Sequence, residues 1–230
     1  MDGKLYGVGV GPGDPELLTL KAVNTIAKCP VIAAPDTGGR DQLALQIAAA
    51  HLEGKEILLC DLPMTRDPQI LADRREKAAG ELCRRLGQGR DVAFLTLGDP
   101  SIYATYSYLH RLVARQGFQV EIIPGIPSFC AAAAALGEPL CENEQPLHIL
   151  PGSCANLEEH LGAPGPKVLM KLGKRRGEAL RLLERLGQLP RTALVERCTL
   201  PGERIDRHPG SDDEGDGYFS VLMVREDGQW

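Results

Sequence analysis

The sequence lacks several features that would assign it to a familiar class. No apolar run approaches the roughly 18 residues that a membrane helix needs, and no basic segment followed by an apolar one opens the chain. The net charge is -5 at pH 7, so no overall positive field attracts nucleic acid or an anionic membrane. We therefore expect a cytoplasmic protein that binds neither nucleic acid nor membranes.

The cysteines and histidines also lack the spacing of a metal site. The seven cysteines are scattered without a C-x-x-C pair, and the five histidines show no i, i+4 spacing. Such dispersal disfavours a disulfide framework, a structural zinc site and an iron–sulfur cluster. We predict no metal site, and mostly buried thiols in a reducing compartment.

A short apolar strand, a glycine and proline turn and a helix open the chain, but the turn fails the tests for a nucleotide loop. Counted from Gly7, the third glycine of G-x-G-x-x-G is replaced by Pro12, and counted from Gly9 it is replaced by Asp14. The Gly-Lys-Ser/Thr of a P-loop is likewise absent, and the Asp14 carboxylate would repel a phosphate. The turn therefore indicates a ligand without a polyphosphate, or glycines that only permit a sharp bend.

The first half of the chain alternates strand-like and helix-like patterns. Strands are predicted at 5–10, 31–34, 56–59, 92–96 and 120–123, and helices at 15–27, 42–51, 68–86 and 101–115. This alternation predicts a parallel sheet with helices on both faces, whose ligands bind at the carboxyl ends of the strands. The opening turn and Gly98-Asp-Pro100 both follow strands, so we expect them to converge in space.

A polar, proline-bearing connector is predicted at residues 137–146. It would join a first domain, 1–136, to a second domain, 147–230. Within the second domain, strands are predicted at 147–150, 168–172, 193–196 and 218–224, with a helix at 178–186. Residues 211–217 are interpreted as a solvated acidic loop.

Several strand-end motifs, in this order and spacing, carry the most specific signal. They are Gly9-Val-Gly-Pro-Gly-Asp-Pro-Glu-Leu-Leu-Thr19, Gly98-Asp-Pro100, Ile123-Pro-Gly-Ile126, Val168-Leu-Met-Lys-Leu-Gly173, Val195-Glu-Arg197 and Tyr218-Phe-Ser220. Over almost its whole length the chain resembles the tetrapyrrole methylases, which transfer methyl from S-adenosylmethionine to porphyrinoid precursors. The stretch from Gly98 to Leu109 and the closing Tyr-Phe-Ser strand look most like the branch that methylates C20 of precorrin-2 in cobalamin synthesis.

The resemblance implies a fold, a reaction and partners. The expected fold is α/β, with an N-terminal parallel-sheet domain, a C-terminal mixed-sheet domain and an active-site cleft between them. The expected protein is a homodimeric C-methyltransferase that uses S-adenosyl-L-methionine and releases S-adenosyl-L-homocysteine. Its substrate would be an anionic tetrapyrrole, precorrin-2 or cobalt-factor II.

The resemblance also implies site residues. The donor would be bound by Pro12, Leu97, Gly98, Asp99, Ile102, Ser128, Phe129, Leu172 and Cys198. The catalytic candidates are Asp99, Tyr218 and Lys171. Asp99 would accept the C20 proton, orient the macrocycle or only position the donor.

The carboxylates of the substrate call for local positive charge in an acidic protein. The candidate cations are Lys171, Lys174, Arg175 and Arg176 in the second half, and Arg40 and Arg66 in the first. Three other readings stay open. They are a methylase for a different macrocycle carbon, a non-catalytic module that binds an adenosyl ligand, and a nucleotide-dependent enzyme, which the failed loop tests disfavour.

Overall fold

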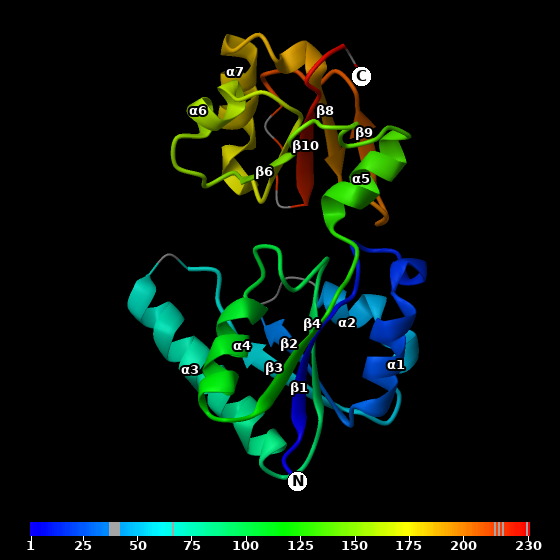
Figure 1. The fold of residues 1–230 in the computed structure, drawn as a ribbon, viewed down its shortest axis with the longest axis vertical. Coiled ribbons are helices and arrows are strands. Elements are labelled where there is room, and N and C mark those ends of the chain that lie inside the picture. Colours follow the sequence, from blue (N-terminus) through cyan, green and yellow to red (C-terminus); the bar gives the residue numbers. More distant parts are fainter. Residues whose placement is uncertain (37–41, 66, 214, 216, 218, 229) are drawn as a thin grey trace. The chain divides into compact units, whose positions relative to one another are not determined.

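The computed structural model covers residues 1–230 and describes all of them except 37–41, 66, 214, 216, 218 and 229. The chain divides into two α/β units, Met1–Pro127 and Ser128–Trp230 (Figure 1). The predicted two-domain α/β fold is confirmed. The contacts group residues 128–136 with the second unit, whereas the sequence interpretation ends the first domain at residue 136.

The first unit is built on a five-stranded parallel sheet in the order β3-β2-β4-β1-β5. Its strands are β1 (Lys4–Gly9), β2 (Val31–Asp36), β3 (Glu56–Asp61), β4 (Val92–Thr96) and β5 (Gln119–Ile123). Because every pairing is parallel, all the carboxyl ends lie along one edge. The strands β4, β1 and β5 are neighbours, so the turns that follow them must meet.

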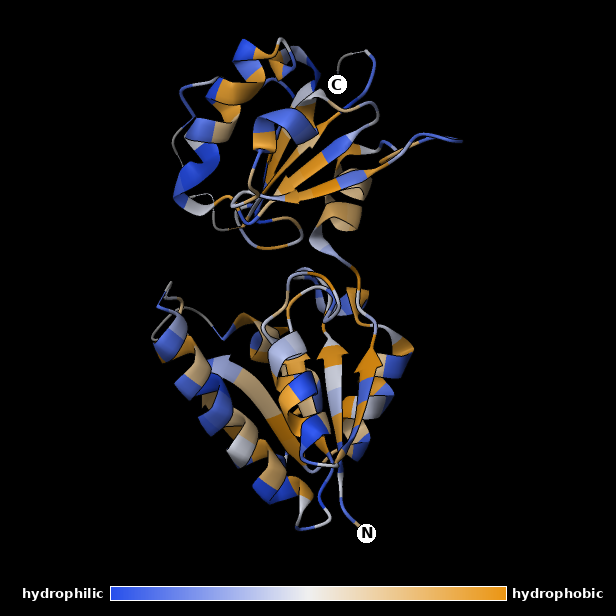
Figure 2. Ribbon diagram, turned by 60° about the vertical axis from the view of Figure 1, so that its left-hand side comes forward, coloured by the Kyte–Doolittle hydropathy of each residue, from blue (hydrophilic) through white to orange (hydrophobic). Residues whose placement is uncertain are grey.

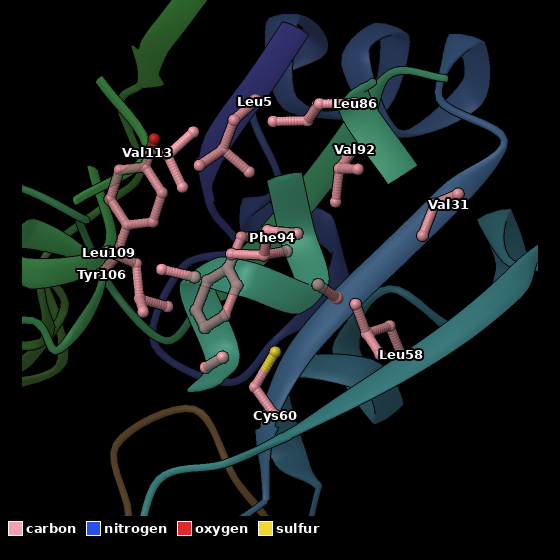
Figure 3. Close-up of a cluster of buried hydrophobic side chains, with 14 of the residues drawn as sticks. Leu5, Val31, Leu58, Cys60, Leu86, Val92, Phe94, Tyr106, Leu109 and Val113 are labelled. Atoms are coloured by element: carbon pink, nitrogen blue, oxygen red, sulfur yellow. The ribbon is translucent and has the colours of Figure 1, made fainter. Parts of the chain in front are cut away.

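Two pairs of helices cover the sheet of the first unit (Figure 1). They are α1 (Leu20–Lys28) and α2 (Leu43–Ile47) on one face, and α3 (Pro68–Leu86) and α4 (Tyr106–Arg115) on the other. Figure 3 shows Phe94 of β4 packed with Tyr106 and Leu109 of α4, all of them buried. Each such side chain contributes about 1.5–3 kcal/mol through removal of apolar surface from water.

Three helices differ from the sequence prediction, and local hydrogen bonds explain two of the differences. The predicted helix 15–27 begins as a 3₁₀ turn, η1 (Pro15–Leu17), and α1 starts only after Thr19, whose hydroxyl accepts from the Ala22 amide at 3.1 Å. The helix predicted from residue 101 begins at residue 106, because Ser101 is held by a hydrogen bond to Asp99. The helix predicted at 42–51 is α2 followed by η2 (Ala49–His51).

The second unit holds a mixed five-stranded sheet in the order β6-β7-β10-β8-β9. Its strands are β6 (His148–Pro151), β7 (Lys167–Met170), β8 (Thr192–Glu196), β9 (Arg204–Asp206) and β10 (Ser220–Val224). The strands β6 and β7 are parallel, while β10 runs antiparallel to both β7 and β8. The mixed sheet is confirmed, and β9 is a strand that the sequence pattern did not predict.

The helices of the second unit pack against this sheet. They are α5 (Ser128–Leu136), α6 (Leu157–Gly162) and α7 (Arg176–Arg185), with the 3₁₀ turns η3 (Gly173–Arg175) and η4 (Leu189–Arg191). Leucines of α6 and α7 share one buried cluster with β7, β8 and β10, while α5 contacts β10. Figure 2 shows hydrophobic residues along the strands of both sheets. No helix in the described part of the chain combines the length and apolar character needed to cross a bilayer.

Because Gly7 has no side chain, the buried Tyr106 ring can pack directly against the backbone of β1. A Cβ atom at Gly7 would lie 2.0 Å from the Tyr106 ring, so we expect Gly7→Ala to cost about 1–3 kcal/mol of stability. Gly80, in the exposed face of α3, has open space around it, and Gly80→Ala should instead stabilise by about 0.5–1 kcal/mol. Urea unfolding of the two variants checks both signs, and equal stabilities would contradict the packing role of Gly7.

Candidate functional site

Three turns at the carboxyl ends of β1, β4 and β5 form what we call the first loop cluster, residues 9–19, 97–105 and 124–127. Gly98 donates its amide to the Gly11 carbonyl at 2.8 Å, and Gly11 donates back to the Gly98 carbonyl at 3.4 Å. These segments lie far apart in the sequence. Their predicted convergence is therefore confirmed by direct backbone pairing.

The glycines of this cluster allow the turns to pack backbone against backbone. A Cβ atom on Gly125 would lie 2.2 Å from the Gly98 carbonyl oxygen, and one on Gly9 would lie 2.6 Å from the Gly125 amide nitrogen. Contacts this short exclude any side chain. The structure thus gives Gly9 and Gly125 a role in turn-to-turn packing, which the sequence alone could not separate from a role in ligand approach.

Asp99 holds two of the turns together through its carboxylate. Its Oδ2 accepts from the Gly125 amide at 3.0 Å, and its Oδ1 accepts from the Ser101 amide at 2.8 Å and also from the Ser101 hydroxyl. The side chain is half-buried. Both carboxylate oxygens are therefore engaged in maintaining the loop geometry.

The remaining predicted donor residues of this cluster are apolar. Leu97 is 36% exposed, Ile102 is half-buried and Pro12 is buried. The sequence interpretation missed Thr96, whose buried Oγ1 has no hydrogen-bond partner among the described residues. A polar residue at the end of an otherwise apolar strand is the signal that could have found it. Such a hydroxyl is available to a polar ligand group or an ordered water.

All the charged side chains of the first loop cluster are acidic. Its three segments contain no lysine or arginine, and they carry Asp14, Glu16 and Asp99. Asp14 accepts from the Glu16 amide at 2.8 Å and caps η1. Without a cation, the cluster suits a neutral or cationic ligand better than a polyphosphate.

A second loop cluster, residues 151–153, 171–176 and 197–203, follows β6, β7 and β8. These strands run in the same direction, so their carboxyl ends lie along one edge of the second sheet. The Gly173 amide donates to the Gly217 carbonyl at 3.2 Å, which ties this edge to the loop that precedes β10. The second unit thus also gathers strand-end loops, separately from the first.

Three predicted site residues lie in the second loop cluster. Leu172 is 3% exposed and Cys198 is 6% exposed, so both side chains are buried. Burial, with a contribution from the charge of Glu203, raises the pKa of the Cys198 thiol to about 12. Lys171 has an accessible side chain, yet surrounding protein atoms displace water from its ammonium, and this desolvation lowers its pKa.

The other predicted site residues lie at the start of α5 or outside the described part of the chain. Ser128 begins α5 and is half-buried, and the adjacent Phe129 is 5% exposed. Tyr218, Arg40 and Arg66 lie outside the described residues. Within the described part of the chain, no group of three or more histidine, cysteine or acidic residues could hold a metal ion.

The sequence interpretation, in which Arg176 binds the substrate carboxylates, is wrong. The Arg176 side chain is 1% exposed and forms ion pairs with Glu196 and Asp213, while Ser220 Oγ accepts from it at 3.2 Å. Within the predicted solvated loop 211–217, the Asp213 side chain is only 12% exposed and pairs with Arg176. Arg176 and Asp213 are 37 residues apart, so no local sequence pattern could predict this ion pair.

Arg204 extends the network around Asp213. It contacts the Asp213 carboxylate at 2.8 Å and donates to Glu196 at 3.0 Å. Burial alone would raise the pKa of Asp213, but the hydrogen bond from Arg204 and the charge of Arg176 hold this pKa below its ordinary value. The network fixes the start of α7 and the end of β8.

Comparison with known proteins identifies the family of this chain. The model of the tetrapyrrole (corrin/porphyrin) methylases matches residues 4–212. A probable cobalt-precorrin-2 C(20)-methyltransferase of Methanocaldococcus jannaschii is 36% identical over 226 residues, which are 96% of this chain and 96% of that protein. The chain belongs to the tetrapyrrole methylase family. The family resemblance that the motifs predicted is thus confirmed.

Two further members of the tetrapyrrole methylase family are informative. The precorrin-2 C(20)-methyltransferase of a Sinorhizobium species is 32% identical over 236 residues, covering 96% of this chain and 95% of that one. The solved uroporphyrin-III C-methyl transferase of Thermus thermophilus, complexed with S-adenyl homocysteine, has a TM-score of 0.73 at 26% identity. The likeness covers 97% of this methylase and 98% of the Thermus chain.

The hydrogen bonds of Asp99 predict that its amide analogue destabilises this methylase. In Asp99→Asn, the side-chain NH₂ must face either the Gly125 amide or the Ser101 donors, so we expect a loss of about 1–3 kcal/mol. Asp67 caps α3 through Oδ1 alone, and Asp67→Asn should stay within about 0.5 kcal/mol of wild type. Urea unfolding measures both variants, and an unchanged Asp99→Asn would refute the loop-holding role.

The lowered pKa of Asp213 predicts a pH dependence of stability. Its ionised form is favoured in the folded state, so its contribution is complete above the unfolded pKa of about 3.9 and is lost as pH falls toward the folded pKa. Asp213→Asn should therefore cost about 1.5–3 kcal/mol at pH 7 and approach wild type near pH 3. Asp212→Asn, at the exposed neighbour, is the control. Thermal unfolding across pH 3–7 would contradict the network if the two variants behaved alike.

Proposed function

We propose that this methylase transfers methyl from S-adenosylmethionine to C20 of precorrin-2, or of its cobalt complex, in cobalamin biosynthesis. The observation that carries the proposal is the near full-length identity to proteins named precorrin-2 and cobalt-precorrin-2 C(20)-methyltransferases. One of these names includes cobalt and the other does not. The proposal therefore includes both forms of the substrate.

The first loop cluster supports a methyl-donor site. The donor is a sulfonium cation without phosphate, and the cluster carries carboxylates and no lysine or arginine. The Thr96 hydroxyl, which has no hydrogen-bond partner among the described residues, offers a polar contact. Leu97, which is exposed, and Ile102, which is half-buried, offer apolar contacts. S-adenosylmethionine, when bound, supplies an electrophilic methyl group.

Positioning is the main catalytic contribution that we assign to this chain. Holding two reactants in the reactive orientation lowers a barrier by roughly 7–11 kcal/mol. Asp99 contributes to this positioning because its carboxylate holds the turn at Gly98 against the turn at Gly125. Both of its oxygens already accept hydrogen bonds, which argues against a role as proton acceptor. Lys171 is the remaining described candidate to receive the C20 proton, since its exposed side chain directly follows β7. Desolvation also lowers its pKa.

The substrate is polyanionic, and exposed cations of the second loop cluster are proposed to bind its carboxylates. Lys174 and Arg175 are both exposed on η3, directly after β7. The Arg175 guanidinium donates to the Gly152 carbonyl at 3.3 Å, which orders this side chain while leaving other donors for a carboxylate. Arg176 has no part in this contact because its charge is already neutralised.

A cytoplasmic homodimer is also proposed. All seven cysteines, each among the described residues, are free thiols, which is typical of a reducing compartment. Ile57 and Leu59 are 43% and 39% exposed on β3, at the edge of the first sheet. Apolar side chains on an edge strand are commonly covered by another chain, and we propose a second copy.

A regiochemical assay tests the proposed reaction. The enzyme is incubated with S-adenosylmethionine carrying a ¹³C-methyl group and with precorrin-2 or its cobalt complex. We expect one labelled methyl group per product molecule, at C20, as read by mass spectrometry and NMR. Label at another carbon would instead make the protein a methylase of different specificity.

Ligand binding provides the control for this assay. S-adenosylhomocysteine should raise the unfolding midpoint, because a ligand that binds only the folded state stabilises it, whereas NAD should not. A shift with S-adenosylhomocysteine but no labelled product would favour a non-catalytic adenosyl-binding module. A shift with NAD alone would favour a nucleotide-dependent enzyme.

A further inference from the structure

The ring of Tyr108, in α4, contacts one arginine from each of two neighbouring helices of the first unit. The guanidinium carbon of Arg75, in α3, lies 3.6 Å from the ring centroid, and that of Arg111, in α4, lies 5.2 Å from it. Both distances are within the range of cation–π attraction. Tyr108 is 42% exposed and Arg111 is also exposed, so these three side chains, which we call the arginine–tyrosine cluster, are open to solvent.

No acidic side chain of the described residues pairs with the two arginines. Neither guanidinium forms a hydrogen bond or an ion pair within this part of the chain, and the buried Arg75 Nε has no acceptor there. The positions three and four residues away from either arginine hold no aspartate or glutamate. Burial lowers the pKa of His110, and the charge of Arg111 lowers it further. The positive charge of the cluster is therefore not neutralised by an ion pair.

At three other places in the described chain, two cations converge on a shared carboxylate. The ring of Tyr6 also has two lysines nearby, and there Lys4 is neutralised by Glu121. The arginine–tyrosine cluster differs, because its two cations converge on a ring without an acidic group. Like charges that share a site repel, and an anion from outside the chain would relieve this repulsion. The three shared carboxylates are Glu121 with Lys4 and Lys21, Glu56 with Arg85 and Arg90, and Asp213 with Arg176 and Arg204.

The arginine–tyrosine cluster lies close to the carboxyl ends of the first sheet. Helix α4 begins directly after residues 97–105 of the first loop cluster, and the Tyr108 amide donates to the Thr105 carbonyl at 3.1 Å. Helix α3, which packs beside α4 (Figure 1), follows the carboxyl end of β3, and Arg75 lies within about two turns of its start. The first loop cluster has only acidic side chains, so the positive charge on this part of the first unit comes from the two helices.

We propose that Arg75 and Arg111 bind a carboxylate arm of the tetrapyrrole substrate, and that Tyr108 holds their guanidiniums in place. This inference rests on the proposed function, which supplies the anionic substrate. It adds a cationic site in the first unit to the one proposed at Lys174 and Arg175. A guanidinium presents paired N–H donors that match a carboxylate, and stacking on a ring orders the side chain before the ligand binds.

Binding of a stable porphyrin tests the cluster without methyl transfer. Uroporphyrin carries an acetate and a propionate on every pyrrole ring, and its fluorescence reports binding. Arg75→Gln and Arg111→Gln should each weaken its binding about tenfold, because each removes a charge-assisted contact. Arg75→Lys keeps the charge but not the planar donor pair, so its affinity should lie between those of Arg75→Gln and wild type. Added salt should weaken binding more steeply in wild type than in the glutamine variants.

Arg84→Gln and Arg115→Gln are the matched controls, because they remove the same charge from exposed positions of α3 and α4. Both should bind uroporphyrin within about twofold of wild type, as expected for isolated surface charges. Affinity for S-adenosylhomocysteine should be unchanged in all four glutamine variants. Urea unfolding checks that each variant is folded, and if Arg75→Gln does not fold, Arg111→Gln decides the question.

The outcomes separate this inference from the proposed function. Uroporphyrin affinities in Arg75→Gln and Arg111→Gln that match those of the controls would overturn the inference, even if the wild type methylates C20. A wild type that binds no uroporphyrin at low ionic strength would overturn it as well. Weakened binding in these two variants, together with no methylated product from the wild type, would support the carboxylate site and overturn the proposed reaction.

Discussion

The close packing of three turns at the carboxyl ends of β1, β4 and β5 is the constraint on which the candidate site depends. Backbone atoms of the neighbouring turns, the Gly98 carbonyl oxygen among them, occupy the positions that side chains at Gly9 and Gly125 would need. The Asp99 carboxylate then connects two of the turns by accepting from both. These contacts determine where the neighbouring Leu97, Ile102 and Thr96 lie, and any ligand must fit the surface that results.

The two units differ in the charged side chains that their strand-end loops carry. The first loop cluster has carboxylates and no cation, which suits a sulfonium donor and disfavours a polyphosphate. The second unit buries Arg176 and neutralises it with Glu196 and Asp213, while Lys171, Lys174 and Arg175 stay accessible. The proposed reaction needs both environments, because its donor is cationic and its substrate is anionic. Burying one arginine of a basic run separates a structural cation from those that remain available to ligands.

Strain and stability are linked in the second loop cluster. Glu203, Arg197 and Pro201 hold a turn in which Thr199 adopts a conformation that glycine would adopt more easily. Glu196 belongs to β8 just before this turn and is anchored by Arg176 and Arg204. The buried ion network therefore supports the strand end from which the strained turn departs.

The sequence by itself determined the α/β alternation, the parallel first sheet and the turns that carry the family motifs, because periodicity and glycine or proline positions are local properties. It could not predict the break at Thr19 or the late start of α4, where side-chain hydrogen bonds to the backbone compete with helix formation. Only the tertiary structure decided that Asp99 holds turns together and that Arg176 is buried. Both outcomes depend on partners distant in sequence, Gly125 and Asp213, whose proximity arises only when strands from separate parts of the chain align.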